Sequence, residues 1–168
     1  FLKLLSANPS VKRSHDAIKN EVYSGGADAV RAVQWLIVPR HPQRFDAVTH
    51  CIEAHGLTVS RRSSWADEPP SVTEPPVGPQ TVWLGDSMGE MARYYALSDV
   101  ALLGGSFEPL GGQNLIEAAA CGCPVVMGPH TFNFAQAAEL AMDGGAAAAV
   151  PDLGAALERA LAWLGDPS

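Results

Sequence analysis

The residues with the clearest chemical potential lie between Gly104 and Pro129, in the stretch GGSFEPLGGQNLIEAAACGCPVVMGP. Glycines let backbone N–H groups approach an anion closely, and a helix start directs unpaired N–H groups and the positive end of its dipole at the same place. We expect such a helix to begin near Gln113 and Asn114. The stretch therefore predicts a phosphate-binding loop made of Gly104, Gly105, Ser106, Gly111, Gly112 and Gln113.

One carboxylate, Glu117, falls one turn inside the expected helix. Acidic residues near the phosphate site of dinucleotide-binding folds accept hydrogen bonds from ribose hydroxyls, so Glu117 is a candidate partner of a ribose diol. In the alternative interpretation, the glycines only turn a long loop and Glu117 stabilises the helix dipole. The stretch matches neither GxGxxG nor GxxxxGK[ST], which argues against dinucleotide oxidoreductases and P-loop hydrolases.

A second candidate segment, PRHPQRF, follows the apolar run at 35–38. Arg40 within it could make a bidentate, permanently charged contact to a phosphate or a carboxylate. The alternative is a loop that Pro39 and Pro42 merely hold rigid.

A third candidate segment, GDSMGEM, follows the apolar run at 81–84. The backbone of residues 87–89 could read the edge of a base, and Met88 or Met91 could pack on its face. The alternative is an ordinary helix N-terminus, with Asp86 as its cap and Glu90 near the positive end of the dipole.

Apolar runs alternate with helix-like segments along most of the chain, and Gly56 stands where a helix C-cap belongs. The Pro- and Ser-rich segment 61–80 is expected to be an exposed loop. Strands that are apolar on both faces, each followed by a helix, predict a doubly wound, Rossmann-like α/β domain. The expected strands are 35–39, 57–60, 81–85, 100–105, 124–128 and 146–150, and the expected helices are 43–56, 87–99, 114–121, 133–145 and 153–165.

Composition restricts the class of protein. A chain of 168 residues that is 47% hydrophobic can build one domain with its own core. A formal charge of -7 leaves no broad basic field, so we expect no nucleic-acid partner. No apolar run approaches the roughly 20 residues that cross a bilayer, and the beginning lacks a secretory cleavage pattern, so a cytosolic compartment is expected.

The cysteines and histidines predict no metal site and no disulfide. Cys51, Cys121 and Cys123 are expected to be reduced and buried, because a Cys-Gly-Cys turn has poor geometry for a bridge. The five histidines are scattered along the chain, which does not match the ligand spacing of metal sites.

The order of PRHPQRF, GDSMGEMARYY and SDVALLGGSFEPLGGQNLIEAAACGCPVVMGPHTFNF closely resembles the 3-deoxy-D-manno-octulosonic acid (Kdo) transferases of lipopolysaccharide synthesis. The resemblance runs from about Trp35 to Trp163 and implies the C-terminal, donor-binding half of a GT-B glycosyltransferase. It implies CMP-Kdo as donor, a lipid A precursor as acceptor, and work at the cytoplasmic face of the inner membrane by the full-length protein. By position it implies CMP contacts at Pro39, Arg40, Met88, Gly89, Glu90, Asn114, Leu115, Ile116 and Glu117.

The resemblance also implies that the acceptor site and the catalytic base lie in an N-terminal half, so no catalytic residue is expected within residues 1–168. Arg40 and the helix start could meet the single phosphate of CMP-Kdo, so no metal ion or other cofactor is expected. Gln113 stands where the family usually has His. The family's Ser/Thr-x-Glu-Gly-Glu-Glu segment has no counterpart before Ala32, so no site is assigned there.

Two other functions remain open at this point: a nucleotide-binding module without chemistry, and a GT-B-like sugar-nucleotide epimerase. An upstream coding sequence of similar length with an apolar anchor would favour the transferase over the module. A preference for CMP over UDP would favour it over the epimerase.

Overall fold

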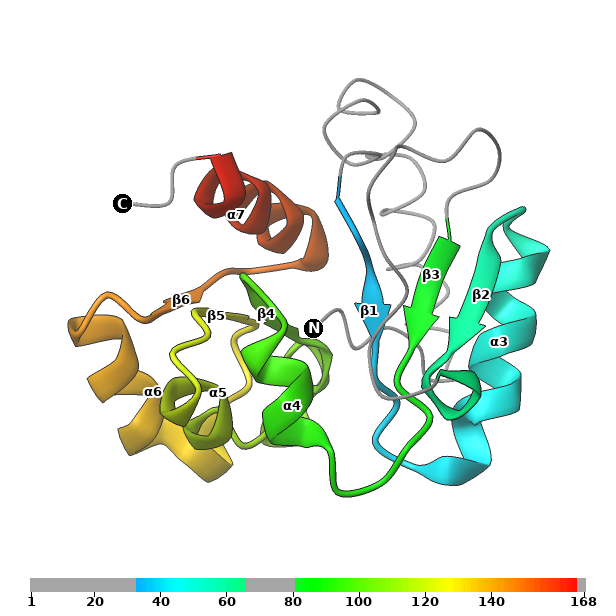
Figure 1. Cartoon of the computed structure of the whole chain (residues 1–168). Helices are drawn as coiled ribbons and strands as arrows, with labels where there is room; N and C mark the ends of the chain where they lie inside the picture. Colours follow the sequence, from blue (N-terminus) through cyan, green and yellow to red (C-terminus); the bar gives the residue numbers. More distant parts are fainter. Residues whose placement is uncertain (1–32, 66–80, 166–168) are drawn as a thin grey trace.

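The computed structural model describes residues 33–65 and 81–165. Within these ranges, six strands form two parallel sheets of three strands each (Figure 1). The first sheet has the order β1-β3-β2, with β1 (Leu36–Ile37), β2 (Thr58–Arg61) and β3 (Thr81–Leu84). The second has the order β4-β5-β6, with β4 (Ala101–Leu103), β5 (Val125–Met127) and β6 (Ala147–Ala149).

One hydrophobic cluster contains residues of both sheets. Successive side chains of a strand point to opposite faces, so Leu36 and Val38 face one way and Ile37 the other. Leu36 and Val38 pack in the same cluster as Leu103 of β4 and Met127 of β5. Among the described strands, no ladder of backbone hydrogen bonds joins β1 to β4. Strand β1 is only two residues long, and Pro39, which lies two residues after it, has no N–H to donate.

Helices cover both faces, as the doubly wound α/β class requires. Helix α3 (Phe45–Ala54) packs Val48 and Ile52 on the first sheet. On the second sheet, α7 (Leu153–Gly165) lies on one face, opposite α4 (Met91–Ala96), α5 (Ile116–Ala120) and α6 (Ala135–Asp143) (Figure 1). The predicted fold class and all six predicted strands are therefore confirmed.

Three helices end at glycines in the left-handed region, Gly56, Gly122 and Gly145, with φ of 74°, 68° and 73°. At the end of α3, Gly56 N donates to Glu53 O and Leu57 N donates to Ile52 O, which is the Schellman arrangement. The predicted C-cap at Gly56 is thus confirmed. Gly122 has the same role after α5, so the glycine of the Cys-Gly-Cys sequence ends this helix.

Several predicted boundaries are wrong. Helix α4 begins at Met91, and the predicted cap Asp86 does not cap it. Helix α5 begins at Ile116 and not at Asn114, because Asn114 Oδ1 accepts the Ile116 N–H (3.0 Å) in a turn that precedes the helix. The helix has five residues. The expected loop 61–80 begins instead with the last residue of β2 and a 3-10 turn at Arg62–Ser64; residues 66–80 lie outside the described ranges.

The cysteines are free thiols, as expected. Cys123 is buried, whereas Cys51 and Cys121 are only partly buried. Among the helices that the structure describes, none has the length and apolar character needed to cross a membrane.

Candidate nucleotide-binding site

Three loops leave the carboxyl ends of the strands at neighbouring positions: 38–44 after β1, 85–90 after β3 and 104–115 after β4. Strand β1 pairs with β3, so the first two loops are adjacent. Helix α4 packs on α5 through Tyr94, Leu115 and Ala118, which brings the second and third loops together (Figure 1). Ligands of open α/β sheets bind at this edge, and all three predicted segments lie on it.

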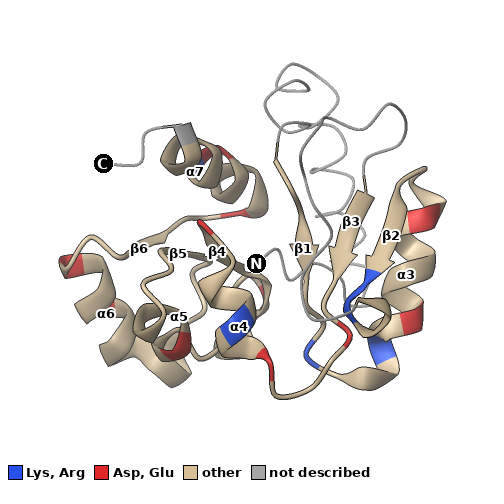
Figure 2. Cartoon of the chain, viewed as in Figure 1, with Lys and Arg blue, Asp and Glu red and all other residues tan. Residues whose placement is uncertain are grey.

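Basic residues are concentrated at this edge. Figure 2 shows Lys and Arg where the strands of the first sheet end, on α4 and on α7, with Asp and Glu interspersed among them at the edge of the first sheet. Arg40 is exposed directly after the buried Pro39. Arg61, Arg62 and Arg93 are paired with carboxylates. Arg40 is therefore an exposed cation of these loops that is suited to contact an anion.

Glu117 is exposed in the first turn of α5. Its Oε1 accepts a hydrogen bond from Asn114 Nδ2 (3.1 Å), so the two polar side chains lie together at the loop end. Ile116 is exposed beside them, whereas Leu115 is buried and could offer a ligand only its backbone.

Gly111 and Gly112 are buried, with φ of 88° and 83°. A Cβ on Gly111 would lie 2.0 Å from Asn133 Nδ2, and one on Gly112 would lie 3.0 Å from His130 O. Asn133 N also donates to Gly111 O (3.1 Å). These two glycines are therefore required for packing against residues 129–134. This supports part of the alternative interpretation, in which the glycines have a structural role in the loop.

Ser106 ties the ends of β4 and β5 together. Its hydroxyl is fully buried, donates to Leu103 O (2.5 Å) and accepts from Gly128 N (2.6 Å). Since both hydrogen bonds are internal, the Ser106 side chain faces the protein. Gln113 also turns inward, because its Oε1 accepts from Gly105 N (3.5 Å).

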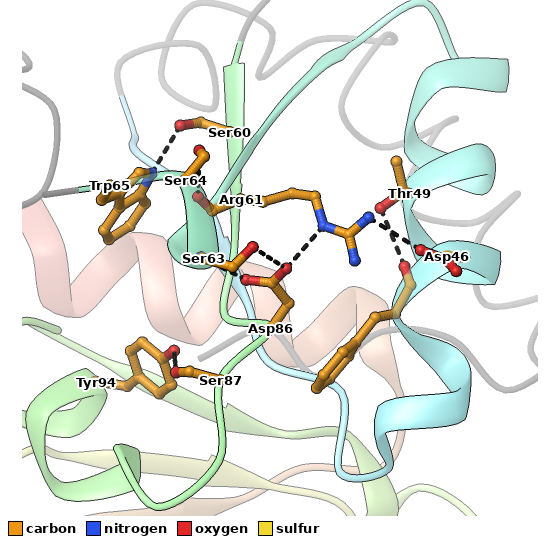
Figure 3. Close-up of polar contacts among 11 residues, drawn as sticks. Asp46, Thr49, Ser60, Arg61, Ser63, Ser64, Trp65, Asp86, Ser87 and Tyr94 are labelled. Atoms are coloured by element: carbon orange, nitrogen blue, oxygen red, sulfur yellow. Dashed lines mark hydrogen bonds and ion pairs between the residues drawn. The ribbon is translucent and has the colours of Figure 1, made fainter.

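Asp86 is the centre of a polar cluster that the sequence did not predict (Figure 3). Arg61 donates to Asp86 (2.7 Å) and to Asp46 (2.9 Å), and Ser63 donates to Asp86 through its backbone N–H (2.8 Å) and its hydroxyl (2.7 Å). Burial by itself would raise the pKa of Asp86, but the hydrogen bonds from Ser63 and Arg61 outweigh it and lower this pKa below its ordinary value.

The replacement Asp86→Asn is expected to lower the stability of the folded chain at pH 7 by about 2 kcal/mol, since it removes the charge from these bonds. A depressed folded pKa contributes stability above the unfolded value of about 3.9, and this stability is lost as pH falls through the folded pKa. The difference in melting temperature, about 4–8 °C at pH 7, should therefore shrink below pH 4. Thermal melts across pH test this, with exposed Asp99→Asn as control; a difference independent of pH would contradict it.

Glu90 is held in a second polar group. Its Oε1 lies 2.8 Å from Arg62 Nη2 and 3.5 Å from Arg93 Nη1. Ser87 donates to its Oε2, and the Tyr94 hydroxyl, which is hydrogen-bonded to Ser87, lies 3.5 Å from the same oxygen. The hydrogen bond from Ser87 and the one from Arg62 lower the pKa of Glu90. Between Asp86 and Glu90, Met88 is 66% exposed and Gly89 has a φ of 78°.

Large apolar side chains are also exposed at this edge. Leu110 is 71% and Phe132 64% exposed, on the two segments that Gly111 and Asn133 join. Met88 and Ile116 add to them on the neighbouring loops. Among the described residues, no group of three or more His, Cys, Asp or Glu side chains is arranged to hold a metal ion.

The fold and the edge loops together define the class: a doubly wound α/β domain of the kind that forms the C-terminal half of a GT-B glycosyltransferase. No family model matches the chain. The chain is similar to the "C-terminal CMP-Kdo binding domain of WaaA from Acinetobacter baumannii", with a TM-score of 0.75 and 30% identity over 99% of this chain and 79% of that one. The chain belongs to the 3-deoxy-D-manno-octulosonic acid transferase family.

Full-length relatives agree with this membership. The chain is 52% identical over 134 residues to a 3-deoxy-D-manno-octulosonic acid transferase of Bordetella pertussis, and 38% identical over 126 residues to one of Haemophilus influenzae. These alignments cover 79% and 75% of this chain. The chain spans less than a third of the relatives, 29% and 28% of their lengths.

Proposed function

We propose that the chain is the donor-binding domain of a Kdo transferase and binds CMP-Kdo at the edge formed by the loops after β1, β3 and β4. The observation that carries the proposal is the likeness to a CMP-Kdo binding domain over nearly the whole chain, with a TM-score of 0.75 and 30% identity. The convergence of three loops at one edge of the sheets, with Arg40 and Glu117 exposed on two of the segments, supports it.

In the proposed complex, Arg40 contacts the phosphate, Glu117 the ribose diol, and the backbone of Met88 and Gly89 the base. Arg40 and Glu117 are exposed, and both have side chains suited to their partners. Since α5 has only five residues, the attraction for phosphate comes from single N–H groups near Asn114 and from Arg40 more than from a helix dipole.

In the whole protein, residues 1–168 form one domain, and a separate N-terminal half holds the lipid A precursor and supplies the catalytic base. Transfer takes place at the cytoplasmic face of the bacterial inner membrane, which only the full-length protein contacts. The chain's short share of its relatives, 29% of the Bordetella protein, supports a further half of this kind.

The replacement Glu117→Gln is expected to weaken CMP binding by about 1–3 kcal/mol, because a charge-assisted hydrogen bond to the ribose is lost. Stability should hardly change, since Glu117 is exposed and bonded only to Asn114 among the contacts described. Calorimetric titration with CMP and thermal melts measure both effects. Glu139→Gln, an exposed carboxylate on α6, is the matched control and should bind CMP normally. Unchanged CMP binding by Glu117→Gln would contradict the ribose assignment.

A further inference from the structure

Two consecutive arginines hold the two ends of the loop after β3. Arg61 donates to Asp86 (2.7 Å) at the start of the loop, and Arg62 donates to Glu90 (2.8 Å) at its end. Figure 3 shows the first of these contacts beside Ser63 and Ser87. We refer to Arg61, Arg62, Asp86 and Glu90 as the arginine brace.

The carboxylate of Glu90 has contacts with four side chains of the protein. A carboxylate offers about four acceptor positions on its two oxygens. Arg62 and Arg93 contact Oε1, while Ser87 and Tyr94 contact Oε2. The contacts of Arg62 and Ser87 are short, whereas those of Arg93 and Tyr94 are 3.5 Å long, so a nucleotide that contacts Glu90 would compete with Arg93 and Tyr94 for the remaining positions.

Arg62 is the stronger of the two cations on Glu90. Its side chain is 16% exposed, against 44% for Arg93, and its distance to Oε1 is shorter by 0.7 Å, 2.8 against 3.5 Å. The Arg62 guanidinium also lies 5.9 Å from the ring centre of Trp65, which packs edge-on against Trp83 of β3 at 5.1 Å. The brace is thus anchored through two aromatic rings to the first sheet.

The middle of the loop has no such support. Met88 is exposed, and a Cβ on Gly89 would meet no atom within 4 Å. Cytosine and uracil differ in the direction of the hydrogen bonds at their edge, so a loop distinguishes them only if its own donors and acceptors are fixed in place. Ser87 is held by its hydrogen bonds to Glu90 and Tyr94, whereas no side-chain contact is described for Met88 or Gly89. The shape of residues 87–89 therefore depends on Ser87 and on the contacts at the two ends of the loop.

We propose that the arginine brace fixes the shape of residues 87–89 for recognition of a cytosine edge, which makes Arg62 and Glu90 positioning residues for base discrimination. The proposal rests on the proposed function, since it requires this loop to face the base of the donor. It assigns a role to Arg62, in a segment that the sequence indicated only as an exposed loop.

The test is calorimetric titration of CMP and UMP into the 168-residue chain and into Arg62→Met. The unmodified chain should prefer CMP, and Arg62→Met should reduce this preference about tenfold, the effect of one lost hydrogen bond. Arg62→Lys keeps the charge and should recover part of the preference. Glu117→Gln should weaken both nucleotides and leave their ratio unchanged, which separates ribose binding from base discrimination.

Arg93→Met is the matched control and should keep the preference for CMP, because its contact with Glu90 is longer and more exposed. The proposed role of the brace, but not the proposed function, would be wrong if Arg62→Met left the ratio of CMP to UMP affinity unchanged. It would also be wrong if Arg93→Met changed this ratio as much as Arg62→Met. If Arg62→Met does not fold, Arg62→Lys and Glu90→Gln are compared on the same ratio. An unmodified chain that binds neither nucleotide, or both equally, would overturn the proposed function and the brace with it.

Discussion

Given CMP-Kdo and a lipid A precursor, the 168-residue chain is expected to transfer no Kdo on its own. Transfer requires an acceptor hydroxyl to be deprotonated while it is held near the anomeric carbon, and this positioning supplies much of an enzyme's rate enhancement. At the donor edge, Glu90 is bound to Arg62 and Glu117 is assigned to the ribose. The base and the acceptor site are proposed to lie on the N-terminal half, across a cleft that closes on the donor.

The assay compares the chain with the full-length protein in one buffer, after CMP binding by the chain has been verified there. We expect turnover only from the full-length protein, and we expect turnover to appear when a purified N-terminal half is added to the chain. Turnover by the chain alone would contradict the division of labour between two halves. It would require a base among these residues, with the half-buried Glu108 of the loop after β4 as the first candidate.

The replacement Gly111→Ala is expected to destabilise the chain by about 3 kcal/mol, or about 6–12 °C in melting temperature. A φ of 88° costs an L residue about 1–2 kcal/mol. The new Cβ would lie 2.0 Å from Asn133 Nδ2 and 2.8 Å from Phe132, so both residues must move. A movement of Asn133 would also weaken the hydrogen bond from its backbone N–H to Gly111 O.

Gly56→Ala is the matched control for this prediction. Gly56 has a similar φ of 74°, but a Cβ there meets no atom within 4 Å. The control should therefore show only the backbone cost, about 1–2 kcal/mol. Equal melting temperatures for the two variants would show that the contact between Gly111 and Asn133 does not stabilise the loop.

The strands and the helix ends could be predicted because their signals are local. Gly56 sits next to the apolar residues whose helix it ends, and the runs at 81–84 and 101–103 are apolar on both faces. The helix starts were harder to predict because they depend on distant partners. Asp86 has the composition of an N-cap, but Arg61 and Ser63, more than 20 residues earlier, take its carboxylate.

The sequence predicted that the three candidate loops lie at one edge of the sheets, but it did not predict their internal contacts. The glycines after β4 indicated a loop at the ligand edge, yet the sequence could not reveal that Gly111 and Gly112 pack against residues 130–133. Nor did any single stretch indicate an apolar surface, because Leu110 and Phe132 lie more than 20 residues apart, on segments that only the fold joins, through Asn133 and Gly111. The sequence assigned Arg61 and Arg62 to a Pro-rich loop, because Asp86 and Glu90, which bind them, follow only after that loop.

Calorimetric titration of the chain with CMP, CDP, UMP and UDP, each with magnesium and with a chelator, tests the central claim most directly. One arginine and a few backbone N–H groups suit one phosphate, so we expect CMP to bind, weakly and equally well with or without magnesium, and more tightly than UMP or UDP. Tighter binding of UDP, or binding of CMP that requires the divalent ion, would contradict a CMP-Kdo donor site on this chain.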